Sequence, residues 1–531
     1  MTQMNKVFFL IFCCCFSVVK AQDCGNNFDC WRSNGIALYE QREYESAISA
    51  FKLARTCPDM PPLNDVRSWM EKIRDEQSSV ADGGREIVNV RALRLAPTEM
   101  STPWLDRGVE SYVKGEYQKA LDCFLKSGNP TNMTQVNEWM EKATYGRAAN
   151  ELFKNGLLDS AKYMYMRIKT PFDSDFAENR LAEIEHIWRV WQPLSNYKPD
   201  TLNLTEMDLQ GLPSEIGTQT QLKTIDLSNN QLNSLPTKML RLYNLSNLKL
   251  NQNQFTEIPL PLTLISNLQV VEMRENQVKE INPKLFSLKK LRELDLSNNK
   301  IESLPFEIRN AQQLEELYLN HNSLSVLPSE ITQLKKLKAL SFAHNQVHEL
   351  PLGFGNLSEL QTLDWSDNGY IKAMNTDFGN LQKLTEIDLS NNALLSPLPE
   401  EYGKLVGLET IRMSHCNLAV LPQSFSALTS LKSLDLEGNL LSALPENIGA
   451  MRALQILDLS NNHLYQIPAS IGNLAALQEL NLSNNPMLKA LPTEIKNCKE
   501  LKELNLSNTG ISEELIKTYK PLLPKECVII R

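Results

Sequence analysis

The sequence predicts an α/β solenoid, with a parallel sheet on its concave face, preceded by an all-α helical array. Three observations support this prediction. The pattern LxxLxLxxN recurs at a nearly fixed step from Asn230 to Asn485. Aromatic and small residues recur at helical spacing over residues 27–190. Pro193 and Pro199 interrupt the chain between the two regions.

One repeat shows how the solenoid is expected to form. Alternation through Leu294 and Leu296 predicts a short strand with two inward side chains, and Asp295 faces outward. The asparagine that follows, Asn299, can bond free backbone groups of adjacent turns as a ladder, since an amide both donates and accepts. Pro305 then ends the extended segment. No repeat can bury its own leucines, so neighbouring repeats must stack.

The predicted structural ladder runs through most of the second half of the chain. Cys416 stands where the pattern expects an asparagine. The ladder positions are Asn230, Asn253, Asn276, Asn299, Asn322, Asn345, Asn368, Asn392, Cys416, Asn439, Asn462 and Asn485.

The two ends of the solenoid depart from the repeat, as terminal repeats must if they are to cover the core. Met207 takes the asparagine position of a degenerate opening repeat. Residues 511–531 predict a C-terminal cap with a short helix over residues 515–523 and a last edge strand. Val528 and Ile530 lie one repeat length beyond Leu504 and Leu506, so we expect them to be its inward residues.

These motifs resemble a known family. The recurring step Leu-Pro-x-x-Ile/Phe, as in residues 304–308, 327–331, 444–448 and 491–495, is similar to the Ras-group leucine-rich repeat proteins and to the repeat domains of plant disease-resistance proteins. The resemblance covers about residues 200–531. It implies a leucine-rich repeat horseshoe, but it says little about the partner, because this scaffold serves many different ligands.

The helical region resembles tetratricopeptide repeats. Trp104, Gly108, Tyr112, Tyr117 and Phe124 lie close to their spacing, and a similar set begins earlier in the chain at Trp31. Residues 66–72 and 136–142 are also alike, which predicts a unit of one helix pair plus one extra helix. A weaker third copy spans residues 149–165, and a last helix is expected over about residues 173–190.

The tryptophans at the end of this region, Trp188 and Trp191, have two interpretations. They could cover the open edge of the first leucine-rich repeat, or they could belong only to the helical core. The helical region itself could bind an extended peptide or serve only as a cap.

The N-terminus predicts export. Lys6 precedes an apolar run over residues 7–19, and a small residue, Ala21, suits a cleavage site, so we expect a signal peptide over residues 1–21. An uncleaved anchor or a buried segment is the alternative. The predicted domains are then the helical domain, residues 22–195, and the leucine-rich repeat domain, residues 196–531. The mature chain contains no predicted transmembrane segment.

The cysteines are expected to be mostly unpaired. Seven cysteines remain after cleavage, and Cys416 and Cys498 are expected to be buried free thiols, although a Cys498–Cys527 disulfide is an alternative.

The charge of the chain limits the classes of partner. The formal net charge is −9, and residues 351–450 hold 5 basic and 12 acidic residues. Nucleic acid is therefore not an expected partner. A basic or neutral protein surface is favoured.

Outward strand positions that depart from the usual Asp or Asn, together with acidic residues of the later repeats, form the predicted partner-binding set. The alternative is a solvated face without a dominant contact. The set is Lys249, Glu272, Arg274, Tyr318, His321, His344, Asp364, Asp388, Arg412 and Asp435.

One column suggests metal chemistry. His321, His344 and Asp367 share a register in three successive repeats and should lie about 5 Å apart in order. They are a weak candidate for a divalent metal site, because parallel strands do not make such side chains converge. Alternatively, the histidines could make partner binding sensitive to pH. We expect no cofactor and no catalytic residue, since no catalytic motif lies on a suitable turn.

The sequence therefore predicts a non-catalytic protein–protein interaction scaffold of the extracytoplasmic space, which binds a protein partner on the concave face. The alternative is a structural, adhesin-like protein that organises the cell envelope or surface and has no soluble ligand.

Overall fold

The computed structural model describes residues 102–127, 133–168, 175–194, 198–394 and 397–531. The predicted signal peptide, the helices expected before residue 102, and Cys24, Cys30 and Cys57 lie outside these residues. Within the described ranges, no helix combines the length and the apolar character needed to cross a bilayer.

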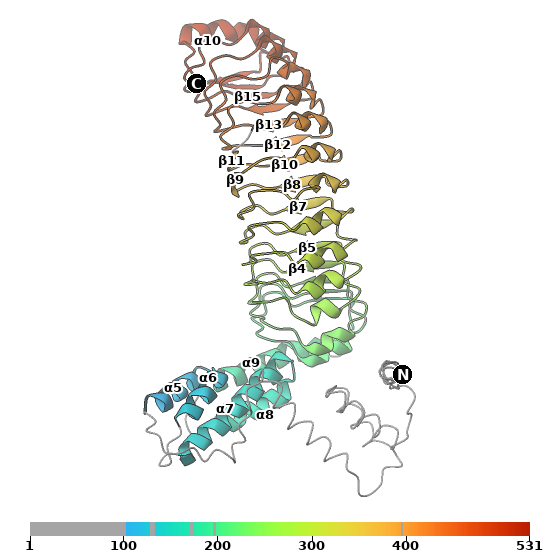
Figure 1. The fold of residues 1–531 in the computed structure, drawn as a ribbon, viewed down its shortest axis with the longest axis vertical. Helices are drawn as coiled ribbons and strands as arrows, with labels where there is room; N and C mark the ends of the chain where they lie inside the picture. The colour runs from blue at the N-terminus through green and yellow to red at the C-terminus, as the bar shows by residue number, and fades with distance from the viewer. Residues whose placement is uncertain (1–101, 128–132, 169–174, 195–197, 395–396) are drawn as a thin grey trace, which may run out of the picture. The chain divides into compact units, whose positions relative to one another are not determined.

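The helical region consists of antiparallel neighbours, and the strongest contacts join consecutive helices. Its helices are α5 (Thr102–Val113), α6 (Tyr117–Lys126), α7 (Met133–Lys154), α8 (Leu158–Ile168) and α9 (Asp175–Trp191), followed by the 3-10 helix η1 (Gln192–Leu194). The predicted pairs α5–α6 and α7–α8 are present (Figure 1).

Aromatic residues fill the space between these helices. Tyr112, Tyr117 and Phe124 are buried, and the rings of Tyr112 and Tyr117 meet edge to face at 5.4 Å. A side chain at Gly108 would collide with the Phe124 ring, so the glycine permits the close approach of α5 and α6. The small residues therefore act as the sequence predicts.

The prediction of a separate extra helix after the α5–α6 pair is wrong. Residues 136–142 do not form a separate helix after the α5–α6 pair; they form part of the long helix α7. Near the start of α7, Trp139 packs on the rings of Tyr112 and Phe124. Near its end, Phe153 is buried beside Arg180 of α9. No proline interrupts α7, and Gly146 is accommodated within the helix, so a single helix packs with both α6 and α8.

Among the described residues, fifteen short strands form one parallel sheet in chain order, apart from β9 and β11. The strands of this sheet are β1 (Thr201–Asn203), β2 (Thr224–Asp226), β3 (Asn247–Lys249), β4 (Val270–Glu272), β5 (Glu293–Asp295), β6 (Glu316–Tyr318), β7 (Ala339–Ser341), β8 (Thr362–Asp364), β10 (Glu386–Asp388), β12 (Thr410–Arg412), β13 (Ser433–Asp435), β14 (Ile456–Asp458), β15 (Glu479–Asn481), β16 (Glu503–Asn505) and β17 (Val528–Ile530).

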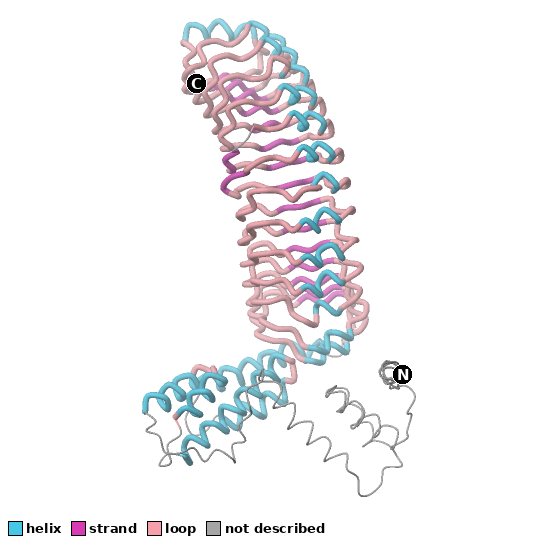
Figure 2. Tube along the Cα trace, in the orientation of Figure 1, coloured by secondary structure: helices cyan, strands magenta, loops and turns pink. Residues whose placement is uncertain are grey.

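The opposite side of each turn carries a 3-10 helix, and Figure 2 shows strands and helices as two separate files. Most of these helices begin directly after a proline, which cannot continue a strand. They are η2 (Ser214–Thr218), η3 (Thr237–Arg241), η4 (Leu262–Leu264), η5 (Pro283–Ser287), η6 (Phe306–Asn310), η7 (Ser329–Gln333), η8 (Phe354–Asn356), η9 (Thr376–Asn380), η10 (Glu400–Lys404), η11 (Gln423–Ala427), η12 (Ile448–Ala450), η13 (Ala469–Asn473) and η14 (Thr493–Asn497).

The asparagine ladder is confirmed. The side chain of Asn345 donates to the carbonyl oxygens of Leu319 and Phe342, both at 3.0 Å, and accepts from the Leu324 N–H at 2.8 Å. The same pattern links the turns from Asn230 to Asn485. Each amide thus satisfies backbone groups that the irregular turns would otherwise leave buried and unpaired.

The ladder changes chemistry at Cys416. Its buried thiol donates to the Leu389 carbonyl at 3.2 Å, and burial raises the pKa of this thiol to about 12. A thiol accepts hydrogen bonds poorly, and the Leu394 N–H donates instead to the Cys416 carbonyl. Close by, β9 (Gly369–Ile371) and β11 (Asn392–Leu394) form a small sheet apart from the main one (Figure 2).

The predicted free thiols are confirmed for Cys416 and Cys498, which are both buried and unbridged. Cys527 is also a free thiol, so the alternative Cys498–Cys527 disulfide is not formed.

The C-terminal cap follows the prediction in its elements but not in its register. Helix α10 (Glu513–Tyr519) and η15 (Lys520–Leu522) precede β17, as expected. However, Ile529 pairs with inward Leu504, while Val528 and Ile530 face outward. The step from β16 to β17 is longer by a single residue than the sequence predicts, and such a shift reverses the faces of a strand.

Candidate functional site

The outward side of the fifteen-stranded sheet, here called the sheet face, carries a column of polar residues at the third position of each strand. Most of these residues accept a hydrogen bond from the backbone of the turn that follows their own strand. Asp364 accepts hydrogen bonds from the N–H and hydroxyl of Ser366, at 3.2 and 2.8 Å. Asp388 and Asp435 accept the N–H two residues ahead at 2.9 and 3.0 Å. The usual Asp or Asn is therefore a backbone cap.

Two repeats obtain this cap from a neighbour instead. Glu272 and Ser341 occupy the third position of β4 and β7, and neither caps its own turn. The side chain of Asn251 accepts the Arg274 N–H at 2.8 Å, and Asn320 accepts the Ala343 N–H at 2.9 Å. Each asparagine belongs to the preceding repeat, so Glu272 remains available for other contacts.

Glu272 instead takes part in a network of ion pairs. Lys249 Nζ lies 2.8 Å from Glu272 Oε1, and Arg274 lies 3.8 Å from Glu272 Oε2. Arg274 Nε also lies 3.3 Å from Asp295 Oδ2. The two carboxylates are nearly covered, at 8% and 9% exposure, whereas Arg274 is half exposed. Buried carboxylates are thus paired with cations that reach the surface.

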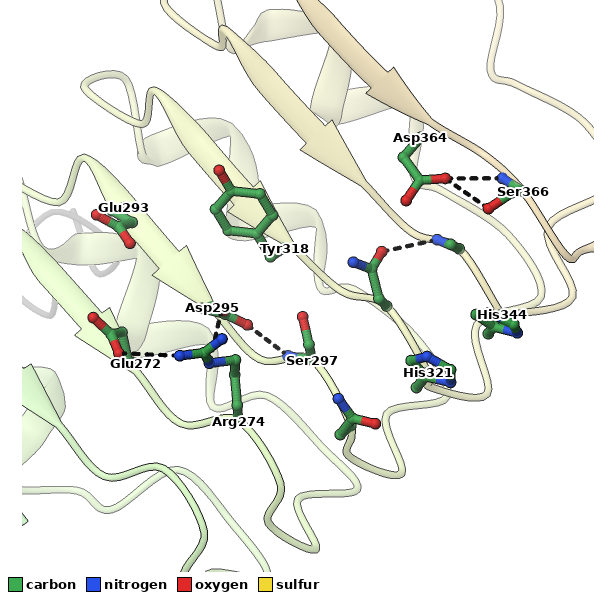
Figure 3. A pocket seen from close by; sticks show the side chains of 13 residues that line it. Glu272, Arg274, Glu293, Asp295, Ser297, Tyr318, His321, His344, Asp364 and Ser366 are labelled. Atoms are coloured by element: carbon green, nitrogen blue, oxygen red, sulfur yellow. Dashed lines mark hydrogen bonds and ion pairs between the residues drawn. The ribbon is translucent and has the colours of Figure 1, made fainter. Parts of the chain in front are cut away.

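This network forms one wall of a depression on the sheet face. The depression, here called the sheet pocket, has a volume of about 580 Å³ and spans strands β4 to β8. Figure 3 shows the Tyr318 ring standing between the Arg274 group and Asp364. The pocket is lined by Glu272, Arg274, Glu293, Asp295, Ser297, Asn298, Tyr318, Asn320, His321, Ala343, His344, Asp364 and Ser366.

The electrostatics of the sheet pocket are dominated by acids. Burial raises the pKa of Asp295, although the Ser297 N–H and hydroxyl oppose the change. Burial and then the adjacent Glu316 carboxylate raise the pKa of Glu293. The Tyr318 hydroxyl donates to Glu316 at 2.7 Å, and burial together with this bond raises the pKa of the phenol. A positively charged group would lower the cost of keeping these carboxylates ionised.

The histidine column is assembled as the repeat spacing predicts. The rings of His321 and His344 stack with centroids 4.0 Å apart, and His344 Nε2 lies 3.5 Å from Asp367 Oδ2. All three residues have positive φ values of 52–53°. Several other repeats have asparagine here, as at Asn298 and Asn461, and asparagine tolerates this backbone conformation better than most residues.

This arrangement is flat rather than convergent. The two imidazole planes differ by only 11°, so the rings lie parallel and do not turn toward a common point. Among the described residues, no group of three His, Cys, Asp or Glu side chains is arranged to hold a metal ion. The stacked rings instead form one wall of the sheet pocket.

The predicted partner-binding residues separate into two groups. Six line the sheet pocket: Glu272, Arg274, Tyr318, His321, His344 and Asp364. Lys249 adjoins it through Glu272. Asp388, Arg412 and Asp435 lie on later strands, where Arg412 pairs with Glu386. Burial raises the pKa of both Asp388 and Asp435.

Two large aromatic residues, directly after β7 and β8, belong to the core. Phe342 and Trp365 are fully buried, and the indole N–H of Trp365 donates to the Val347 carbonyl at 2.7 Å. Sequence reasoning did not select Glu293, Asn320 or Ser366 for the site. The available signal was an asparagine two residues after an outward residue that is not Asp or Asn, as at Asn251 and Asn320.

Comparison with known proteins agrees with this architecture. The family described as leucine-rich repeat region matches residues 274–394 and 426–522, and the family described as Leucine Rich Repeat matches residues 221–242. Comparison with curated proteins gives no match.

Several solved structures are similar. A leucine-rich repeat protein of Leptospira interrogans is 30% identical, with a TM-score of 0.53; the match covers 65% of this chain and 98% of that one. A plant peptide hormone receptor, solved in complex with RGF2, is also 30% identical, with a TM-score of 0.51; the match covers 58% of this chain and 51% of the receptor.

A Listeria monocytogenes internalin is 22% identical and shares the fold, with a TM-score of 0.53 over 66% of this chain and 94% of the internalin. The repeat spacing, the asparagine ladder, the parallel sheet and these matches agree. The chain belongs to the leucine-rich repeat proteins.

Proposed function

We propose that this protein is an exported, non-catalytic scaffold that binds a protein partner on its sheet face, with the sheet pocket as the principal contact. The observation that carries the proposal is the coincidence of two features. The pocket spans repeats in which Glu272 and Ser341 stand in place of the usual capping residue. It also brings together an ion network, an aromatic ring and two stacked histidines.

The pocket is prearranged for binding. Neighbouring repeats supply the caps of Arg274 and Ala343, and Arg274 is held between two carboxylates. A rigid surface loses little conformational freedom on association, which lowers the entropic cost of binding. Tyr318 suits the centre of such a contact, because tyrosine is frequent among the residues that dominate interface energies.

The remainder of the sheet face would guide rather than hold the partner. Residues 351–450 hold 5 basic and 12 acidic residues, so a basic partner surface would be attracted from a distance. Outside the sheet pocket, the carboxylates of Asp388 and Asp435 already cap backbone N–H groups. Their role in binding is therefore proposed to be electrostatic steering.

The comparisons support binding as a class of function. Leucine-rich repeat proteins in general mediate protein–protein interaction, and the similar plant receptor was solved with the peptide hormone RGF2. We propose no catalysis, because the pocket carboxylates are engaged in ion pairs and backbone caps. Export rests on the apolar N-terminal segment, and the mature chain would begin near Gln22.

The proposal is tested by recovering partners from the extracytoplasmic fraction of the source cells with the mature chain as bait. Tyr318→Ala should reduce recovery of a specific partner about tenfold or more. Tyr243→Ala is the matched control, because Tyr243 is exposed near the 3-10 helix η3, away from the strands. Retention of full binding by Tyr318→Ala would reject the sheet pocket as the contact.

Steering is tested separately with asparagine substitutions. Asn481 and Asn505 cap their turns as the aspartates do, so the double variant Asp388→Asn and Asp435→Asn should keep its fold. We expect a slower association rate at low salt and little change at high salt.

Failure to recover any specific partner with the wild-type chain would favour the structural, envelope-organising alternative.

A further inference from the structure

A second cavity lies far from the sheet pocket in the sequence, where the helical region meets the first repeat. Its volume is about 490 Å³. It is lined by Asp159 of α8, Trp188 and Trp191 of α9, Gln192 of η1, and Glu215 and Thr218 of η2. Here it is called the tryptophan cavity.

The walls of the tryptophan cavity are fixed relative to one another. The Ser214 N–H donates to the Gly156 carbonyl at 2.9 Å, which joins η2 to the turn before α8. On α9, His186 Nε2 lies 2.7 Å from the Met207 carbonyl oxygen. The cavity therefore does not depend on a ligand to bring its sides together.

Trp191 anchors this arrangement. It is only 3% exposed, and it lies with Leu202 and Leu222 around a small void of about 10 Å³ at the first turn of the solenoid. Trp191 therefore covers the first repeat, which is one of the two interpretations of these tryptophans. Trp188 is only half buried, and it leaves aromatic surface at the cavity.

The charge of the lining is negative. Asp159 and Glu215 are the ionisable residues of the lining, and neither forms an ion pair within the described part of the chain. Glu215 accepts a hydrogen bond from the Ser214 hydroxyl at 3.3 Å. Lys238 donates to that same hydroxyl at 3.1 Å rather than pairing with the carboxylate.

Aromatic faces and carboxylates attract the same kind of ligand. A cation over an indole face is stabilised by the ring quadrupole, and Trp is the strongest of the aromatic residues in this contact. Two carboxylates at the same cavity add direct charge attraction, while the partly exposed Trp188 indole accepts apolar groups attached to the cation. The volume lies within the range of small-molecule sites, roughly 300–1,000 Å³.

We propose that the tryptophan cavity binds an organic monocation, an ammonium or guanidinium group that carries alkyl substituents. This site is independent of the proposed partner contact on the sheet face. The cation could come from a lysine or arginine side chain or from a free amine, and these sources share the chemistry that the cavity recognises.

The experiment uses the mature full-length chain and two pairs of probes. Choline is compared with 3,3-dimethyl-1-butanol, which has a similar shape and no charge. The blocked peptide acetyl-Gly-Arg-Gly-amide is compared with acetyl-Gly-Gln-Gly-amide. Binding is followed by isothermal titration and by nuclear magnetic resonance of the indole N–H groups.

The charged member of at least one pair should bind about tenfold more tightly than its neutral counterpart. Tighter binding of choline would identify a free amine as the source, and tighter binding of the arginine peptide would identify a side chain. Equal binding within both pairs, or no binding at all, would overturn the proposal.

Variants locate the binding. The double variant Asp159→Asn, Glu215→Gln removes the charges and keeps the shape, and it should weaken the cation about tenfold. Trp188→Leu should have a similar effect. Unchanged affinity in both variants would overturn the assignment to this cavity.

The repeat provides a matched control. Glu330 follows Ser329 on η7 as Glu215 follows Ser214 on η2, and the Ser329 hydroxyl likewise donates to Glu330 at 3.2 Å. Glu330 does not line the tryptophan cavity. Glu330→Gln should leave cation affinity unchanged, and an equal loss with this variant would show that the effect is not local and would overturn the proposal.

Discussion

The phenol of Tyr519 closes the last turn of the solenoid on the backbone of Leu491. Its oxygen accepts the Leu491 N–H at 2.8 Å, and its hydroxyl donates to the Leu491 carbonyl at 3.1 Å. The phenol of Tyr402 differs: it is fully buried in a stack of rings with Phe378 and Phe425, and its hydroxyl has no hydrogen-bond partner among the described residues. Burial raises the pKa of Tyr402 well above its usual range.

The two tyrosines should respond in opposite directions to phenylalanine. Tyr402→Phe removes an unsatisfied buried hydroxyl, so the free energy of unfolding should rise by about 1 kcal/mol. Tyr519→Phe leaves the Leu491 N–H and carbonyl without their partner, so it should fall by about 2 kcal/mol. Urea denaturation measures both changes, and a loss of stability in Tyr402→Phe would contradict this account.

The asparagine ladder predicts a large effect in the middle of the solenoid. Asn345→Ala removes the acceptor of the Leu324 N–H and the donor to the Leu319 carbonyl. The free energy of unfolding should fall by about 3 kcal/mol, because buried backbone groups lose their partners. Asn310 is exposed at the end of η6, so Asn310→Ala is the control and should change stability by less than about 0.5 kcal/mol.

Gly156 joins the helical region to the first repeat and should tolerate no side chain. Its φ is +69°, and a Cβ would lie 2.5 Å from the Leu212 carbonyl oxygen and 2.7 Å from the Ser214 nitrogen. Gly156→Ala should lower stability by about 2 kcal/mol or more and speed hydrogen exchange at the Ser214 N–H.

Gly369 has a positive φ like Gly156, but it has no close neighbour, so it shows the effect of backbone strain without a steric clash. Its φ is +85°, but a Cβ there would meet nothing within 4 Å. Gly369→Ala should therefore lower stability by only about 1 kcal/mol. If the two alanine variants were equally stable, the contact between Gly156 and the first repeat would not be as close as described.

The acids of the sheet pocket predict a change of stability with pH. Burial and the Glu316 carboxylate raise the pKa of Glu293 in the folded chain. A raised pKa means that the folded state holds the proton more tightly than the unfolded state. The stability contributed by protonation is complete below the unfolded pKa of about 4.3 and is lost as pH rises through the folded pKa.

Glu293→Gln should therefore unfold at a higher urea concentration than the wild-type chain at pH 7. The difference should shrink as the pH falls below about 4, where the wild-type carboxyl is also neutral. Glu503 is exposed at the equivalent position of β16, and Glu503→Gln serves as the control. A difference that stayed constant between pH 7 and pH 3.5 would contradict the raised pKa.

The repeating part of the fold could be predicted from the sequence, because every repeat carries the same pattern of residues. Alternating leucines such as Leu294 and Leu296 predict the strands, and the constant step predicts which residues stack, as His321 and His344 do. The prediction failed where that rule stops. The C-terminal cap lengthens the step by a single residue, so Ile529 rather than Val528 faces inward.

The site was only partly predictable, for a physical reason. A departure from Asp, such as Glu272, is visible in one repeat. The cap that permits it is Asn251 of the preceding repeat, and its bond to the Arg274 N–H crosses between turns. The tryptophan cavity depends on residues from separate elements, such as Asp159 and Glu215, whose proximity follows from packing and not from any spacing in the sequence.

The thiol at Cys416 also has a mechanical consequence. Amide side chains tie each turn to the next by donating and accepting, but at this position the side chain only donates, and it does so weakly. Tension applied along the long axis would therefore separate the coil first at this joint. A molecule stretched in optical tweezers should yield in two extensions, one on either side of this residue, and a version with Asn in its place should resist a greater force before the first extension.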